Sequence, residues 1–378
     1  SVWSDSYMIS PAVQAAFDNF WDNALASDDI GIQDHYANMW KMLAKRYKHD
    51  QGVIGFDLMN EPFMGSQAQQ VMPLMIQGYA HLMMDLESDW KEGSLSESMQ
   101  DLAIKWGDEQ GRLDILRTIQ DPAQYAPVIN AAAPLCQAFE TDILNPFYQK
   151  LRDSIRTVNA HHILFLEHNY FANTGISSAI TVPLDKMGEP DKLVAYAAHG
   201  YDLVTDTKEV GTPSYSRVDY IFRGIKKKSD ALNIPLFIGE WGAFGGDHPI
   251  YLETSAAVLS LYEEFGCSHT YWCYNGNDFA SKAYFPVLNR AFPQAVSGKL
   301  GNYVYNSTDH SFFVEWEATG LEKFPTRIFF PDQESFDPQK IELIPAADFT
   351  FEKNSQTGSI FLYIPATRFA GVRKISYY

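Results

Sequence analysis

The sequence has few cysteines and no long apolar run. Its 378 residues include three cysteines, Cys136, Cys267 and Cys273. These are too few for a disulfide framework, and the spacing of the last two fits no common metal motif. We interpret all three as buried free thiols, because their neighbours are apolar or aromatic. No stretch of about 20 consecutive apolar residues occurs, so no membrane-spanning helix is expected.

Basic residues are scarce as well. Lys and Arg together number 29 against 47 Asp and Glu, which gives a net charge of −18. A surface this acidic repels phosphate backbones, so a nucleic-acid partner is not expected. The sequence also lacks a Gly-rich phosphate loop, a Gly-x-Ser-x-Gly elbow and a His-Glu-x-x-His motif, which argues against phosphoryl transfer, serine hydrolase and zinc protease chemistry.

Hydrophobic residues are plentiful, at 46%, and aromatic residues reach 14%, enough for a large core and two domains. Apolar residues recur at helical spacing over residues 11–46. Short apolar runs typical of strands buried on both faces alternate with helical stretches at 217–232 and 252–265, a pattern that predicts parallel βα units. The predicted strands are residues 53–59, 162–166, 192–198, 235–239 and 268–273.

The segment from about 67 to 159 has helical periodicity and an acidic patch near 87–100. It is too long for a simple βα loop, so we expect part of it to be an insertion over one end of the fold. Its apolar positions include Met75, Met83 and Met84, which fit either a core stripe or an apolar groove, with the core as the default.

The character of the sequence changes at residue 297. From there on, short alternating or aromatic runs are separated by Pro, Gly, Asp and Asn, which predicts a C-terminal antiparallel β-sandwich over residues 297–378. Residues 1–296 would then form the first domain. The predicted sandwich strands are residues 303–305, 311–317, 326–330, 340–343, 349–353, 359–364 and 373–377.

Two glutamates follow predicted buried strands directly: Glu61, in Asn-Glu-Pro, and Glu240, in Gly-Glu-Trp-Gly. In a βα barrel, this end of the strands is where catalytic groups gather. Two carboxyl groups about 5–5.5 Å apart, one protonated and one ionised, are what retaining glycoside hydrolysis requires. A lone glutamate in such a position is more often a helix cap or an ion-pair partner. The pair in these two contexts favours catalysis.

These motifs resemble glycoside hydrolase family 5, whose (β/α)8 TIM barrels carry Asn-Glu-Pro after the fourth strand and Glu at the seventh. The longer segments resemble the endoglycoceramidase branch of that family, which also has a C-terminal β-sandwich. The segments that carry this resemblance are Phe-Asp-Leu-Met-Asn-Glu-Pro-Phe-Met-Gly at 56–65, Ala-Phe-Asp-Asn-Phe-Trp at 16–21 and Leu-Asn-Arg-Ala-Phe-Pro-Gln-Ala-Val-Ser-Gly at 288–298.

The resemblance implies roles for individual residues. Glu61 would be the acid/base and Glu240 the nucleophile, and no metal or organic cofactor would be needed. Asn60 would bind the sugar 2-hydroxyl, Tyr201 would hold the nucleophile, and His199 would help to set the acid/base pKa. Trp272 would form a platform under the sugar, unless it is simply core, just as His199 could be a satisfied core histidine. Glu167, His168 and Asp278 are weaker candidates for substrate contact, and Asp278 could equally cap a helix.

The resemblance also implies a difference from the family. Only five barrel strands are predicted, corresponding to family strands four to eight. The family's first three strands supply further sugar-binding residues that have no counterpart here. We therefore expect a segment carrying strands one to three, either as a separate associated chain or as part of a longer sequence. The alternative is a different, complete fold. The chain begins at Ser1 without an initiator Met or a signal peptide, which indicates a processing site or a chosen boundary.

The resemblance predicts a β-glycosidase that cuts between the glycan and the ceramide of glycosphingolipids. The enzyme would act at a micelle or membrane surface and be secreted or extracytoplasmic. A cytoplasmic location is the alternative. Two other functions stay open. One is an exo-acting glucosylceramidase or steryl β-glucosidase of the same family. The other is a non-catalytic fragment that binds glycan or lipid.

Overall fold

The computed structural model describes residues 5–86, 100, 102, 104–205, 207–242, 249–274, 276–331 and 336–378. The chain divides into two compact units. The first comprises Ser1–Phe244 with His269–Trp272, and the second comprises Gly245–Ser268 with Cys273–Tyr378. We describe each unit by itself.

Parallel strands form the centre of the first unit. Strands β1 (Gly55–Asp57), β2 (Ile163–Leu166) and β3 (Val194–Tyr196) pair in parallel, in that order. Parallel bridges from Tyr196 to Leu236 and from His199 to Glu240 continue the sheet into β4 (Phe237–Gly242), which pairs with β5 (Ser268–Trp272). Four of the five predicted strand segments contain one of these strands, and the fifth, 235–239, overlaps β4, which continues to Gly242. Among the described residues, no strand pairs with the other edge of β1.

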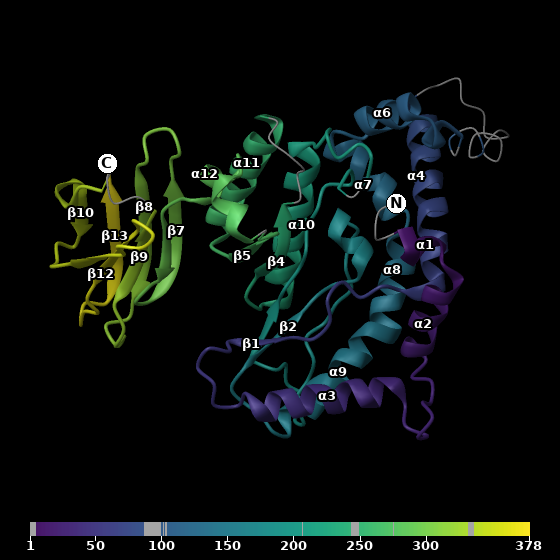
Figure 1. The fold of residues 1–378 in the computed structure, drawn as a ribbon, viewed down its shortest axis with the longest axis horizontal. Helices are drawn as coiled ribbons and strands as arrows, with labels where there is room; N and C mark the ends of the chain where they lie inside the picture. The colour runs from purple at the N-terminus through teal and green to yellow at the C-terminus, as the bar shows by residue number, and fades with distance from the viewer. Residues whose placement is uncertain are drawn as a thin grey trace. The chain divides into compact units, whose positions relative to one another are not determined.

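Most helices of the first unit lie to the right of β1 and β2 in Figure 1. The segment 11–46, predicted as helical throughout, forms two helices, because Asn23 and Asp29 adopt positive φ angles of 51° and 62° in the turn between them. The helices and short helical turns are α1 (Asp5–Ile9), α2 (Pro11–Trp21), α3 (Ile32–Arg46), η1 (Gly65–Gln70), α4 (Val71–Leu86), α6 (Glu109–Thr118), α7 (Pro122–Asn130), α8 (Ala133–Phe139), η3 (Glu140–Leu144), α9 (Asn145–Arg156), η4 (Tyr170–Thr174) and α10 (Tyr215–Leu232).

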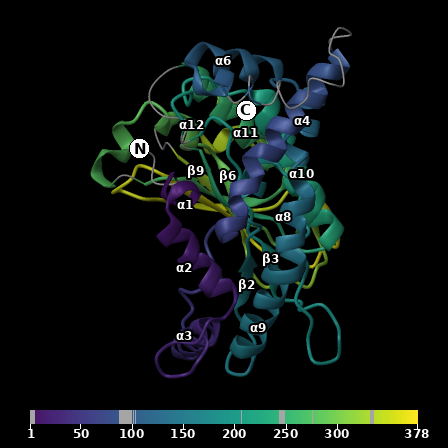
Figure 2. The ribbon, with the colours of Figure 1, turned by 90° about the vertical axis from the view of Figure 1, so that its right-hand side faces the viewer.

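The described residues of the region 67–159 are mainly helical, as predicted, with short turns between the helices. Most of the acidic patch of this region lies outside the described residues. Within this region α4 packs on α7, and α9 at its end packs on α3. Helices α8 and α9 run on into one another through the π-helical turn η3, as Figure 2 shows. Among the described residues, none of the helices has the length and apolar character needed to cross a bilayer.

The second unit contains the predicted antiparallel strands. Two four-stranded sheets, in the orders β10-β13-β8-β7 and β11-β12-β9-β6, enclose a core that includes Trp316, Val314 and Ile375. The sheets begin at β6, a few residues before the predicted boundary at 297. The elements of this unit are α11 (Pro249–Phe265), η5 (Gly276–Ser281), α12 (Phe285–Leu288), β6 (Phe292–Ala295), β7 (Lys299–Tyr305), β8 (Phe312–Ala318), β9 (Thr326–Phe330), η6 (Pro338–Lys340), β10 (Ile341–Ile344), β11 (Thr350–Lys353), β12 (Ile360–Ile364) and β13 (Gly371–Tyr377).

None of the three cysteines forms a disulfide bond, as expected from the sequence. Cys136 and Cys267 are buried, whereas Cys273 is only partly buried, which corrects the expectation for that residue. Burial raises the pKa of the Cys136 thiol to about 12, so it remains an unreactive core residue at neutral pH.

Candidate active site

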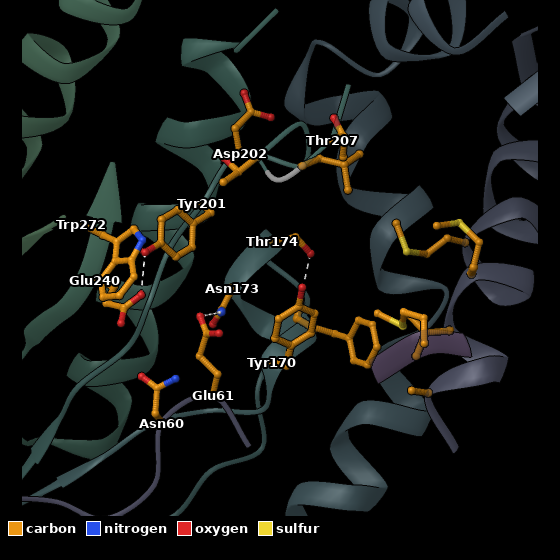
Figure 3. Close-up of a pocket in the computed structure, with 18 of the residues that line it drawn as sticks. Asn60, Glu61, Tyr170, Asn173, Thr174, Tyr201, Asp202, Thr207, Glu240 and Trp272 are labelled. Atoms are coloured by element: carbon orange, nitrogen blue, oxygen red, sulfur yellow. Dashed lines mark hydrogen bonds between the residues drawn. The ribbon is translucent and has the colours of Figure 1, made fainter. Parts of the chain in front are cut away.

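A pocket of about 730 Å³ opens in the first unit at the carboxyl ends of the parallel strands. Both predicted catalytic glutamates, Glu61 and Glu240, face this pocket (Figure 3). Asn60, Tyr201 and Trp272, three further residues predicted for the site, also line it, and about half of the Trp272 side chain is exposed. The structure therefore brings five of the nine predicted site residues to one cavity, although they come from four separate stretches of the sequence.

Glu61 is held through its backbone and its side chain. It has a φ angle of 43°, which is unusual for a non-glycine residue. Its backbone N–H donates a 2.7 Å hydrogen bond to Oε2 of the buried Glu167, which helps to hold this strained conformation. Its carboxylate Oε1 accepts a 2.7 Å hydrogen bond from the amide of Asn173. Only 9% of the Glu61 side chain is exposed.

Glu240 lies within β4, next to His199 across the parallel bridge between their segments. The hydroxyl of Tyr201 donates a 2.7 Å hydrogen bond to Oε2 of Glu240. Burial raises the pKa of the Glu240 carboxyl, whereas the charge of His199 and the hydrogen bond from Tyr201 oppose that rise by favouring the ionised form. The predicted contact between Tyr201 and Glu240 is thus present in the structure.

The His199 ring lies among three carboxylates. Its Nδ1 is 3.1 Å from Oε1 of Glu61 and 3.5 Å from Oε2 of Glu240, and its Nε2 is 3.1 Å from Oε1 of Glu167. The last contact is an ion pair by distance, but its alignment is poor for a hydrogen bond. Burial alone would lower the pKa of His199, but Glu167, Glu61 and Glu240 outweigh burial and raise it to about 10. His199 is therefore an imidazolium that offsets the charge of the carboxylates.

The close packing of His199 explains why Gly239 precedes Glu240. A Cβ atom at this position would lie 2.9 Å from both Cδ2 and Nε2 of the His199 ring. A side chain on residue 239 would push the ring away from the carboxylates. The Gly-Glu sequence at the end of β4 is thus a packing requirement of the site.

Asp57 and Glu167 form a second pair of acidic groups behind the pocket, joined by a hydrogen bond. Burial raises the pKa of Glu167, and His199 opposes that shift. Burial by neighbouring groups and the charge of Glu167 raise the pKa of Asp57 to about 8. The Asp57 residue is exposed along the open edge of β1, and the nearby charge of Glu167 disfavours its ionised form.

The predicted site residues that do not line the pocket are Glu167, His168, His199 and Asp278. Both nitrogens of the His168 ring are held by protein groups, and the residue is 1% exposed. Its place is therefore behind the pocket wall, which differs from the substrate contact expected from the sequence. Asp278 is an exposed residue of η5 in the second unit. Its contact with sugar stays a prediction.

Two residues of the site were missed or undervalued from the sequence. Asn173, which contacts Glu61, comes from the short helix η4, and no sequence pattern marks it. Glu167 directly follows the buried strand β2, the same signal that identified Glu61. That signal was sufficient to find Glu167, but its role as an anchor for the Glu61 backbone depends on tertiary structure.

Glu61, His199 and Glu240 also offer ligand atoms that all lie within 4.8 Å of one another. Carboxylates and imidazole at this spacing are able to bind a divalent metal ion. His199, however, is the cation in this cluster, and a metal would have to displace its proton and that charge. The expectation that no metal is needed stays a prediction.

The first unit carries a pair of glutamates at strand ends. Comparison of the sequence with known protein families shows which family has this arrangement. The pattern of cellulase (glycosyl hydrolase family 5) matches residues 12–112 and 117–278. The chain belongs to glycosyl hydrolase family 5. The pattern of the glycoside hydrolase family 5 C-terminal domain matches residues 290–371.

Individual relatives agree with this family. Endoglycoceramidase I of Rhodococcus hoagii (strain 103S) is 22% identical over 336 residues, which cover 86% of this chain and 54% of that protein. An endoglycoceramidase of Hydra vulgaris is 41% identical over 64 residues, which cover 17% of this chain and 11% of that protein. The matches therefore span about half of the length of the first curated relative and about a tenth of the second.

The fold is shared with a solved structure of endo-glycoceramidase II from Rhodococcus sp., described as a ganglioside GM3 complex. The two chains superpose with a TM-score of 0.66 at 21% identity, over all of this chain and 70% of the other. A second structure of that protein, described as a lactosyl-enzyme intermediate, gives a TM-score of 0.64 over 99% of this chain and 70% of the other. This likeness confirms the predicted fold class, a TIM barrel with a C-terminal antiparallel β-domain.

Proposed function

We propose that this protein is a retaining β-glycosidase that cleaves the bond between the glycan and the ceramide of glycosphingolipids. The observation that carries the proposal is the distance between Glu61 and Glu240, which have carboxylate oxygens within 4.8 Å of each other in one pocket. Retaining glycosidases hold their two carboxyl groups about 5–5.5 Å apart, whereas inverting enzymes hold them farther apart to admit a water.

The contacts of the two glutamates support different roles. Glu240 is poised for the ionised form by the Tyr201 hydroxyl and the positive charge of His199, so it attacks the anomeric carbon. As the glycosidic bond breaks, Glu61 gives its proton to the departing oxygen of the aglycone. Glu61, now a carboxylate, then takes a proton from water, which attacks the glycosyl-enzyme, releases the sugar and restores Glu240.

The pocket changes character along its length. Beside the glutamates it is lined by Asn60, Tyr201 and Trp272, groups that suit a sugar. Farther along, Met72, Met75 and Leu203 belong both to this pocket and to a smaller apolar cavity of about 50 Å³ between α4, α6 and α7. An apolar extension next to the leaving-group side supports a lipid aglycone, and it favours the groove over the core stripe for Met75.

The relatives support this substrate class. The curated proteins are endoglycoceramidases, and one solved structure with this fold is described as a complex with ganglioside GM3. The exo-acting glucosylceramidase or steryl β-glucosidase remains the alternative within the family. The proposed endo-acting enzyme and these exo-acting alternatives differ in their products. An endo-acting enzyme releases an intact oligosaccharide from a ganglioside, whereas an exo-acting enzyme releases single sugars.

Labelling of the nucleophile tests the proposal directly. A 2-deoxy-2-fluoro-β-lactosyl fluoride should add one glycosyl group to Glu240 in the intact protein, found by mass spectrometry of its peptides. Glu240→Ala should prevent labelling and abolish turnover while lipid binding persists. Binding of glycolipid without labelling or turnover would instead identify a non-catalytic binding protein. The sugars released from a ganglioside then decide between endo and exo action.

Action at a membrane or micelle surface is a further part of the proposal. One end of the β-sandwich carries the loops 319–325 and 365–370, which lie against each other at Gly320 and Arg368. They expose Leu321 by 82%, Phe324 by 78% and Phe369 by 43%. Exposed apolar side chains of this kind support insertion into a lipid interface. Leu321→Ser with Phe324→Ser should weaken co-sedimentation with phosphatidylcholine vesicles. Unchanged co-sedimentation would exclude these loops.

Two other expectations remain proposals. No described strand pairs with the outer edge of β1, which supports a further segment that supplies neighbouring strands, either in the same polypeptide or in an associated one. The masses of the polypeptides in the purified protein under denaturing conditions distinguish these two. A secreted or extracytoplasmic location suits a glycolipid-cleaving enzyme, and fractionation of the source cells tests it against the cytoplasmic alternative.

A further inference from the structure

Asn173 is the only neutral donor that the described residues provide to the Glu61 carboxylate. Its side-chain Nδ2 is 2.7 Å from Oε1 of Glu61, and the residue is 4% exposed. The short helix η4 carries Asn173, and the side chain of Asn169 caps this helix. Asn169 in turn is held through its backbone and side chain by the buried carboxylate of Glu140. The position of Asn173 is therefore fixed by the packed interior.

The orientation of the Asn173 amide is fixed by His168. His168 Nε2 lies 2.9 Å from Oδ1 of Asn173 and 3.1 Å from the backbone oxygen of His199. A backbone carbonyl only accepts, so Nε2 carries a proton and also donates to Asn173 Oδ1. On the other side of the ring, His168 Nδ1 accepts a 2.6 Å hydrogen bond from the hydroxyl of Tyr196.

His168 remains neutral in this arrangement. Burial lowers its pKa to about 3, so the ring keeps one proton, on Nε2, across the neutral range. The Asn173 oxygen then faces His168, and its NH₂ group must face Glu61. One buried histidine tautomer thus determines which atom of Asn173 meets the acid/base.

This orientation distinguishes the two oxygens of Glu61. Oε1 accepts from Asn173 and also lies 3.1 Å from Nδ1 of the imidazolium of His199. A proton placed on Oε1 would point at these donors, so a protonated Glu61 carries its hydrogen on Oε2. We propose that Tyr196, His168 and Asn173 form a positioning relay that reserves Oε2 of Glu61 for proton transfer to the leaving group. This inference rests on the proposed glycosidase function.

The relay acts only on proton donation, so its effect depends on the leaving group. Departure of an alkoxide needs a proton from Glu61, whereas 2,4-dinitrophenolate departs without one. The quantity to measure is kcat/KM, for octyl β-lactoside and for 2,4-dinitrophenyl β-lactoside. This ratio reports only the steps up to and including the first irreversible step, which is formation of the glycosyl-enzyme.

Asn173→Ala and His168→Leu should lower kcat/KM for the octyl glycoside by roughly 30-fold or more, within the range of acid catalysis. The same variants should lower kcat/KM for the dinitrophenyl glycoside less than about threefold. His168→Gln places an amide N–H near the position of Nε2 and should recover most of the loss. Such a rescue would show that residue 168 acts through its N–H donor and not only through the volume of its side chain.

The chain offers a matched control at the other end of β2. Asn159 is also buried, and its side chain contacts the ring of His162. Asn159→Ala should lower thermal stability but leave the ratio of the two kcat/KM values unchanged. Equal losses on both glycosides in the Asn173 and His168 variants, or no loss on the octyl glycoside, would overturn the relay. A wild-type protein that cleaves neither glycoside would instead contradict the proposed function.

Discussion

The backbone N–H of Glu61 donates a 2.7 Å hydrogen bond to the carboxylate of Glu167, 106 positions later in the sequence. This bond joins the ends of β1 and β2 and accompanies the positive φ angle of Glu61. Glu167 also lies beside the His199 ring through its other oxygen. Glu167, which contacts no substrate in the proposed mechanism, therefore sets the position of Glu61, the proposed acid/base.

Glu167→Ala should lower kcat by about 100-fold, because small displacements of a catalytic group are that costly. Glu167→Gln keeps an acceptor for the Glu61 N–H and loses only the charge beside His199, so its loss should be smaller. Steady-state kinetics on an aryl β-lactoside measure both. If the two variants lose the same activity, the loss is not caused by removal of the hydrogen bond to the backbone of Glu61.

Tyr201→Phe should move the acid limb of the pH profile to higher pH. Burial already raises the pKa of Glu240, and the Tyr201 hydroxyl lowers it by donating to the ionised form. Loss of this donor raises the pKa further, so a higher pH is needed to ionise the nucleophile. At a pH below the new limb, kcat/KM should fall at least roughly tenfold. An acid limb that stays in place would contradict this role of Tyr201.

Met75→Gln should impair the use of ceramide substrates selectively. Met75 lines both the main pocket and its apolar extension, so a polar side chain there disfavours the lipid chain by about 1–2 kcal/mol, or roughly tenfold in KM. Soluble aryl β-lactosides, which have no lipid, should be cleaved as before. Met187→Gln is the control, because Met187 is 84% exposed in a loop outside the pocket. Equal effects on both substrates would exclude Met75 from the lipid site.

Asp57→Asn should change how stability depends on pH. The folded pKa of Asp57, about 8, is above its ordinary value of 3.8. The proton bound in the folded state therefore stabilises the protein fully below pH 3.8, and this contribution is lost as the pH rises towards 8. Asparagine has no such proton to lose. The difference in Tm between variant and wild type should therefore move in favour of the variant from pH 5 to pH 8. A constant difference would show that Asp57 titrates normally.

The positions of the strands and of the two glutamates were predictable because each rests on a local pattern. Buried parallel strands are continuous apolar runs, and a polar residue that ends such a run is visible without any structure. The break between α2 and α3 was not predicted, because the apolar period continues across it while Asn23 and Asp29 turn the chain. β6 was missed because its four residues, Phe-Pro-Gln-Ala, include a proline and show no alternation of apolar and polar side chains.

The sequence by itself determined the family, the barrel strands, the sandwich and the two glutamates that we propose as the catalytic pair, since all of these depend on residues close together in the chain. Only the tertiary structure decided how the pair is held. It placed Glu167 under the backbone of Glu61, and it moved His168 from an expected substrate contact to the back of Asn173. These contacts join positions more than 100 residues apart or depend on which face of a loop is buried, and no local pattern records either.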